Sequence, residues 1–110
     1  MDIMENSRGG ALVISAAGRM DSSTAGALEA VLPARVRDNR AVVLDLSDVP
    51  YVSSAGLRVL LIGAKAAKAA GHSLTITSVA PAVREVFDIS GFSKIFTIEP
   101  DVEAALEKLS

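Results

Sequence analysis

Residues 41–61 read AVVLDLSDVPYVSSAGLRVLL, and this stretch decides the fold and carries the sharpest chemical signal in the chain. Its first six residues, 41–46, are almost continuously apolar, which predicts a buried, central β-strand. A polar turn follows, and over residues 55–70 the leucines and alanines recur at helical spacing. This order of strand, turn and helix places Ser53 and Ser54 at the start of a helix.

The two hydroxyls at this helix start have two interpretations. Serine is a preferred N-cap residue, so Ser53 and Ser54 could do no more than cap the helix. A helix start also offers free backbone N–H groups and the positive end of the helix dipole, which favour a phosphate on a hydroxyl there. Neither serine is followed three residues later by Glu or Gln, so no capping box forms. Arg58 stands in the first turn, against the dipole, which favours an anion or an acidic partner surface nearby.

Elsewhere in the chain, apolar residues recur at the spacing of strands in some segments and at the spacing of helices in others. This pattern predicts an α/β fold with the order β-β-α-β-α-β-α-β-α. An opening hairpin turns at residues 8–10, and later βαβ crossovers add parallel strands, so the sheet is mixed, with helices layered on it. Pro33 predicts a kink or break in the first helix, because it cannot donate a backbone hydrogen bond. The polar residues of the strand at 73–77 favour one partly open face, and the last strand is expected at 94–98.

Composition narrows the class of protein. The 110 residues fit one domain spanning 1–110, and half of them are apolar, as in a globular chain. A net charge of −2 argues against a general nucleic-acid binder. The absence of cysteine excludes disulfides and thiolate metal sites and suits a reducing compartment. With no signal-peptide pattern and no apolar run long enough for a bilayer, we expect a soluble, cytoplasmic protein without membrane insertion.

Catalytic motifs are absent from the sequence. The chain has a single histidine, and the serines lack the Gly-x-Ser-x-Gly elbow of a hydrolase. No phosphate-binding glycine loop is present, and no carboxylate–histidine cluster has the spacing of metal ligands. We therefore expect a protein that is not an enzyme and that needs neither a metal nor another cofactor.

Three segments together resemble a known family. Residues 52–57, Val-Ser-Ser-Ala-Gly-Leu, look like the signature of STAS domains, and specifically of bacterial anti-sigma factor antagonists. Residues 18–21, followed by Thr24 and Ala25, are similar to the family's early loop and the start of its first helix. Residues 81–91 are similar to its third helix. The resemblance covers nearly the whole chain, and the three matches occur in the family's order.

This resemblance implies a function in transcription regulation by partner switching. It implies that the unmodified protein binds an anti-sigma factor that is also a serine kinase, and so frees a sigma factor. Phosphorylation of Ser54 by that kinase would end the binding, and a serine phosphatase would reverse the mark. Together with the position of Arg58, the resemblance indicates partner-binding residues: Asp21, Thr24, Ser53, Ala55, Gly56 and Arg58.

Some alternatives stay open at the level of sequence. Asp21 fits either an N-cap or a neighbour of the phosphorylation site. Ser53 stands where the family often has Asp, and Arg19 where it has Glu, so the identity of the kinase is open. STAS-like domains also serve as docking subunits of transporters and lipid-transport complexes, where the serine turn would act without phosphate.

Overall fold

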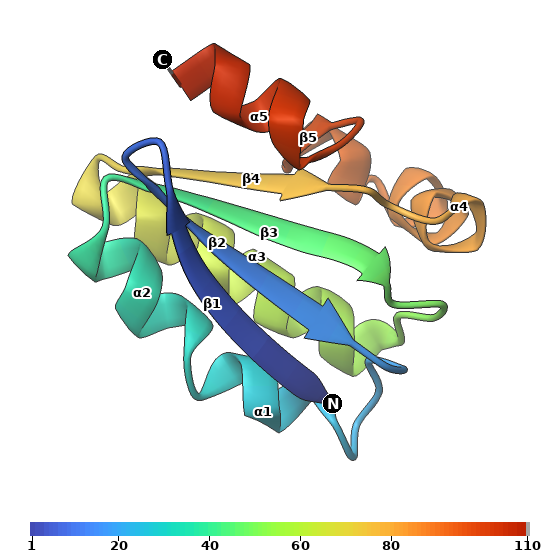
Figure 1. Ribbon diagram of the computed structural model, residues 1–110. Helices are drawn as coiled ribbons and strands as arrows, with labels where there is room; N and C mark the ends of the chain where they lie inside the picture. Colours follow the sequence, from blue (N-terminus) through green and yellow to red (C-terminus); the bar gives the residue numbers. More distant parts are fainter. Residues whose placement is uncertain (110) are drawn as a thin grey trace.

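The computed structural model describes residues 1–109, which build a five-stranded sheet in the order β1-β2-β3-β4-β5 (Figure 1). Strand β1 runs antiparallel to β2, and the following neighbours pair in parallel. The predicted mixed sheet is therefore confirmed. The strands are β1 (Asp2–Arg8), β2 (Ala11–Ala17), β3 (Ala41–Asp48), β4 (Ser73–Thr77) and β5 (Thr97–Glu99).

The helices follow the predicted order with one difference. The predicted break in the first helix is confirmed: α1 ends at Glu29 and α2 begins at Leu32, and Pro33 lies in the first turn of α2, where its missing N–H costs no hydrogen bond. A short 3₁₀ helix, η1, occupies residues 92–94, so the last strand begins at Thr97 and not at 94. The helices are α1 (Ala25–Glu29), α2 (Leu32–Asp38), α3 (Ser54–Ala70), α4 (Pro81–Ser90) and α5 (Val102–Leu109).

The sheet lies between two layers of helices. Because the strands follow one another in chain order, crossovers of the usual right hand put their helices on one face. Helices α1, α2 and α3 lie on that face, and α5, which leads to no further strand, lies across the other (Figure 1). Both faces of the sheet therefore carry helices.

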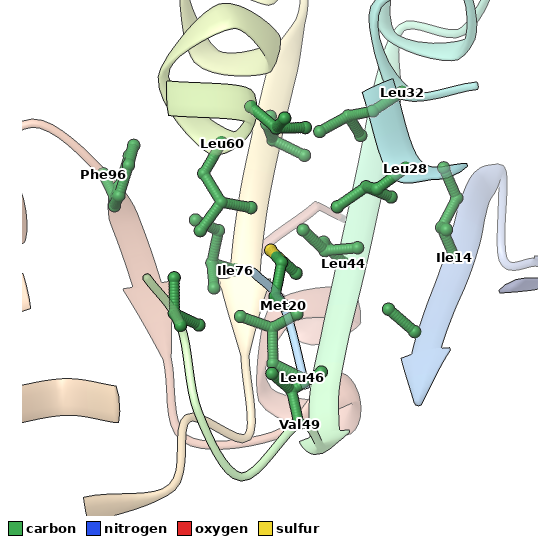
Figure 2. Packing of buried hydrophobic residues seen from close by; sticks show 14 of the residues in the cluster. Ile14, Met20, Leu28, Leu32, Leu44, Leu46, Val49, Leu60, Ile76 and Phe96 are labelled. Atoms are coloured by element: carbon green, nitrogen blue, oxygen red, sulfur yellow. The ribbon is translucent and has the colours of Figure 1, made fainter. Parts of the chain in front are cut away.

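Successive side chains of a strand point to opposite faces of the sheet, so the apolar residues form two clusters, one on each face. In β2 and β3, Ile14 and Leu44 face the main cluster, while Val13 and Val43 face a smaller cluster with Ala105 of α5. Figure 2 shows the main cluster packed between the sheet and the helices. Its fully buried members include Met20, Leu28, Leu32, Leu46 and Leu60.

The expectation that polar residues of β4 would mark an open face is wrong. Thr75 and Thr77 are 5% and 0% exposed. The Thr77 hydroxyl donates a hydrogen bond to the Leu44 carbonyl at 3.2 Å. A hydroxyl that finds a backbone acceptor loses most of the penalty for leaving water, so threonine can be buried in this strand.

Candidate functional site at the start of α3

Helix α3 begins directly after the serine turn, with Ser53 as its N-cap residue and Ser54 as its first residue. The first helical hydrogen bond runs from the Leu57 N–H to the Ser53 carbonyl at 2.9 Å. The N–H groups of the three residues between them have no partner within the helix and point toward its open end. Ser54 is exposed. Ser54 is thus a surface residue at the positive end of the helix dipole.

The neighbouring Ser53 differs from Ser54 in its environment. Its side chain makes no cap hydrogen bond, although its backbone has the extended conformation of an N-cap, with φ −90° and ψ 179°. The Ser53 Oγ is buried and has no hydrogen-bond partner among the described residues. Side-chain capping therefore does not explain why two serines stand at this helix start. Of the two residues, Ser54 is exposed and Ser53 is not.

The loop that precedes α1 is held directly against the serine turn by backbone hydrogen bonds. The Met20 N–H donates to the Tyr51 carbonyl at 2.9 Å, and the Ser53 N–H donates to the Met20 carbonyl at 2.8 Å. Met20 and Val52 form a short parallel bridge. Two of the segments that the sequence singled out, residues 18–24 and 52–57, are thus neighbours in space.

Gly56 has a packing role at this junction. An added Cβ would lie 2.8 Å from Met20 Cγ, 2.9 Å from Val52 Cγ1 and 3.0 Å from the Met20 carbonyl oxygen. Gly56 is itself buried. Gly56, expected among the partner-binding residues, thus has a packing role in the structure: its missing side chain lets α3 lie close to the loop.

Asp21 and Thr24 close the loop by hydrogen bonding. The Asp21 carboxylate accepts from Ser23 Oγ at 2.7 Å and from the Ser23 N–H at 3.0 Å. These bonds hold the pKa of the Asp21 carboxyl below its ordinary value, because they favour its charged form. The Thr24 hydroxyl donates to the Arg19 carbonyl at 2.6 Å and accepts from the Asp21 N–H at 2.9 Å. Asp21 therefore caps the turn before α1, and Thr24, the N-cap residue of α1, makes no side-chain cap hydrogen bond to that helix.

Two arginines flank the serine turn. The Arg19 guanidinium lies 4.3 Å from the centre of the Tyr51 ring, a cation–π contact that no local sequence pattern announces. Arg58 Nη1 lies 3.6 Å from Glu29 Oε1 on α1. The sequence predicted an anion or an acidic partner surface near Arg58, and in the structure the Glu29 carboxylate of the chain itself already faces this arginine. Both arginine side chains are more than half exposed.

The remaining predicted contact residue, Ala55, is half-buried and packs against the main cluster. Within residues 1–109, no cluster of three or more potential ligand side chains is close enough to hold a metal ion. None of the described helices is both long and apolar enough to cross a membrane. At the start of α3 itself, the structure offers an exposed serine, Ser54, on a helix end that has no side-chain cap.

A strand and serine turn thus lead into a helix, and a second loop is hydrogen-bonded beside them. The STAS domain family model matches residues 2–105, and the chain belongs to this family. BtrV of Bordetella bronchiseptica, described as a candidate anti-sigma factor antagonist, is 45% identical over 97 residues, which cover 87% of this chain and 84% of that protein.

Solved structures agree with this assignment. An anti-sigma factor antagonist from Mycobacterium paratuberculosis superposes with a TM-score of 0.87 at 30% identity, covering 97% of this chain and 92% of that chain. The Bacillus cell fate determinant SpoIIAA, solved in its phosphorylated form, has a TM-score of 0.74 at 15% identity and covers 99% and 100% of the two chains. At that identity the second likeness shows a shared fold.

Proposed function

We propose that this chain is an anti-sigma factor antagonist whose partner binding is controlled by phosphorylation of Ser54. The observation that carries the proposal is the exposure of Ser54 at the first position of a 17-residue helix that has no side-chain cap. The names of its relatives support the antagonist function. The phosphorylated form of SpoIIAA supports modification within this fold.

The proposed cycle has two states. Unmodified protein binds an anti-sigma factor that is also a serine kinase, and this binding releases a sigma factor. The kinase then transfers the γ-phosphoryl group of ATP to Ser54 Oγ, ADP leaves, and the hydroxyl proton is released. A serine phosphatase hydrolyses the phosphoserine with water, which restores the hydroxyl and yields inorganic phosphate.

The effect of phosphate falls on the interface and leaves the fold intact. Phosphorylation adds about −1.5 to −2 charges. The first turn of α3 has no acidic residue, so the free N–H groups and the dipole stabilise that charge. An acidic or dry partner surface over Ser54 would instead repel or desolvate the phosphate. A penalty of about 3 kcal/mol there corresponds to roughly a hundredfold loss of affinity.

The loop beside the serine turn confines the effect of phosphorylation to the start of α3. Backbone hydrogen bonds from Met20 and Ser53 fix the position of the helix start before any partner arrives. A partner that covers Ser54 would meet the loop of Asp21 and Thr24 beside it, with Arg58 in the same helical turn. Because Asp21 and Thr24 are already held by hydrogen bonds within the loop, binding requires little further ordering of these two side chains.

The first test is the site of modification. The purified protein is incubated with anti-sigma factors of the serine-kinase class and ATP, and a phosphate-sized mass increase is located by peptide mass spectrometry. We expect the increase on Ser54, its loss in Ser54→Ala, and its retention in the matched variant Ser53→Ala. A mass increase that persists in Ser54→Ala would refute the assignment.

The second test is the binding of each Ser54 variant. Ser54→Ala is expected to bind the anti-sigma factor and to remain bound in the presence of ATP, because it cannot accept phosphate. Ser54→Asp is expected to bind poorly, since its carboxylate places negative charge at the interface. Equal affinities of Ser54→Asp and wild type in a calorimetric titration would contradict the mechanism.

A further inference from the structure

A second surface lies at the opposite end of α3 from Ser54. A groove of about 640 Å³ opens between the last turns of α3, the start of β4 and the segment from η1 into β5. At 1.5 Å per helical residue, Lys68 on its rim is about 20 Å along α3 from Ser54. In Figure 1 this is the end where α3 stops and β4 begins, far from the serine turn. The apolar lining includes Leu61, Ala64, Leu74, Ile76 and Phe96.

The rim of this groove is positively charged and its charges are unmatched. Lys65, Lys68 and Lys94 line the groove and are exposed. Among residues 1–109, six arginines and lysines each lie within ion-pair distance of a carboxylate. The described arginines and lysines without such a partner are Arg37, Arg40, Lys65, Lys68 and Lys94.

The unmatched cations share one end of the molecule. Arg37 lies in the last turn of α2, and Arg40 directly precedes β3. The Ser73 N–H donates to the Arg40 carbonyl at 2.9 Å, which places Arg40 beside the start of β4 and hence beside the groove. A chain of net charge −2 therefore gathers its free positive charge at the amino ends of its parallel strands.

An exposed apolar side chain stands in the same place. Ile95 lines the groove and is 54% exposed, although its neighbour Phe96 is buried and stacks edge-on with Phe87 and Phe92. β5 pairs with β4 only from Thr75 onward, so the start of β4 is left beside the open groove. Apolar walls, an exposed isoleucine and unpaired lysines together match a ligand that is both apolar and acidic.

We propose that this groove binds an acidic, amphipathic segment of a protein partner, with apolar side chains on the groove floor and carboxylates against Lys65, Lys68 and Lys94. A hollow of this volume between secondary-structure elements suits inserted side chains better than it suits a flat lipid surface. Its distance from Ser54 lets the chain hold this segment while its serine turn is occupied. The site is independent of the phosphorylation proposed above.

The test uses a defined probe and the full chain. The probe is a synthetic peptide of about 15 residues with leucines at helical spacing and glutamates elsewhere, long enough to form a helix when bound. Binding is followed by backbone amide NMR shifts. We expect shifts concentrated at residues 61–68, 72–76 and 94–97, with none at the serine turn. Shifts centred on residues 52–58, or no binding, would overturn the proposal.

Paired charge reversals separate the groove from general electrostatics. The double variant Lys65→Glu/Lys68→Glu is expected to weaken peptide binding by at least about tenfold. The control Arg37→Glu/Arg40→Glu makes the same change of net charge at the same end but outside the groove, and should weaken binding less than about threefold. Equal losses in the two variants would overturn the proposal. Ile95→Ser, at an exposed position, should also weaken binding without lowering stability.

Other occupants give distinguishable results. A peptide with lysine in place of glutamate should not bind, and its equal binding would refute the charge complementarity. Vesicles of phosphatidylglycerol that bind the protein through Lys65 and Lys68, while the acidic peptide does not, would point to a membrane and overturn the proposal. A dimer in sedimentation that the same lysine reversal dissolves would likewise identify a second copy as the occupant.

Discussion

The two ends of α3 differ in whether the charged side chains around them have partners within the chain. At the serine end, which comprises residues 18–24 and 48–58, backbone hydrogen bonds join two loops, and Arg19 and Arg58 each have a carboxylate of the chain nearby. At the groove end, the rim lysines have no carboxylate partner among the described residues. A rigid end with matched charges suits a switch, because a new charge there changes the surface and leaves the fold alone. The groove end, whose lysines have no carboxylate partner among the described residues, suits the binding of an acidic partner segment.

Substitution at Gly56 should have the largest effect on stability, if the serine end is as closely packed as its contacts indicate. Gly56→Ala forces a methyl group against Met20 and Val52, and one of the close atoms is the backbone carbonyl of Met20, which cannot rotate away. We predict a loss of about 1–3 kcal/mol in the free energy of unfolding, measured by urea denaturation.

The matched control is Gly26→Ala on α1, where an added Cβ meets nothing within 4 Å. That change should be neutral or should stabilise the protein by up to about 1 kcal/mol, since alanine favours helix over glycine. Equal effects of the two substitutions on the free energy of unfolding would show that the close packing of Gly56 against Met20 does not limit the size of the residue at position 56.

Removal of one hydroxyl from the same loop should have a smaller effect. Thr24→Val keeps the shape of the side chain but deletes hydrogen bonds to the Arg19 carbonyl and the Asp21 N–H. We predict a loss of about 1 kcal/mol in thermal or urea unfolding. Thr97→Val at the groove end, an exposed position, should change stability by less than about 0.5 kcal/mol. A loss at Thr97 equal to that at Thr24 would remove the contrast between the two ends.

The smallest expected effect is a pH dependence at Asp21. Hydrogen bonds from Ser23 lower the pKa of its carboxyl in the folded state, so the charged form stabilises the fold above the unfolded pKa of about 3.9. This stabilisation is lost as the pH falls through the lowered folded pKa. The stability of wild type should therefore exceed that of Asp21→Asn at pH 7, and the gap should narrow below about pH 4. A gap that stays constant down to about pH 2 would show that the charge has no part in holding the loop.

The sequence predicted most of the fold because its signals are local. The apolar run at 41–46 and Pro33 each act through their own backbone, and the structure has a strand over the run and a helix break just before Pro33. The last strand begins later than predicted because a 3₁₀ turn occupies residues 92–94, where Phe92 stacks edge-on with Phe96, a contact that periodicity does not report.

The site was predicted less completely, because its contacts join distant parts of the chain. The family resemblance indicated Ser54, but nothing local announced that Glu29 would face Arg58 or that Arg19 would lie on Tyr51. Gly56 looked like a contact residue until its distance to Met20 gave it a packing role. The groove escaped notice altogether, because it forms only when α3, β4 and η1 come together.

The most direct test of the Ser54 switch is a calorimetric titration of the anti-sigma factor kinase with unmodified protein and with protein phosphorylated on Ser54. Thermal unfolding of both forms is recorded alongside. We predict that phosphorylation lowers the affinity about a hundredfold while Tm changes by no more than about 4 °C, since the helix start accepts the charge. Unchanged affinity, or a phosphorylated protein that has lost its cooperative unfolding transition, would contradict a switch that acts through the surface at Ser54.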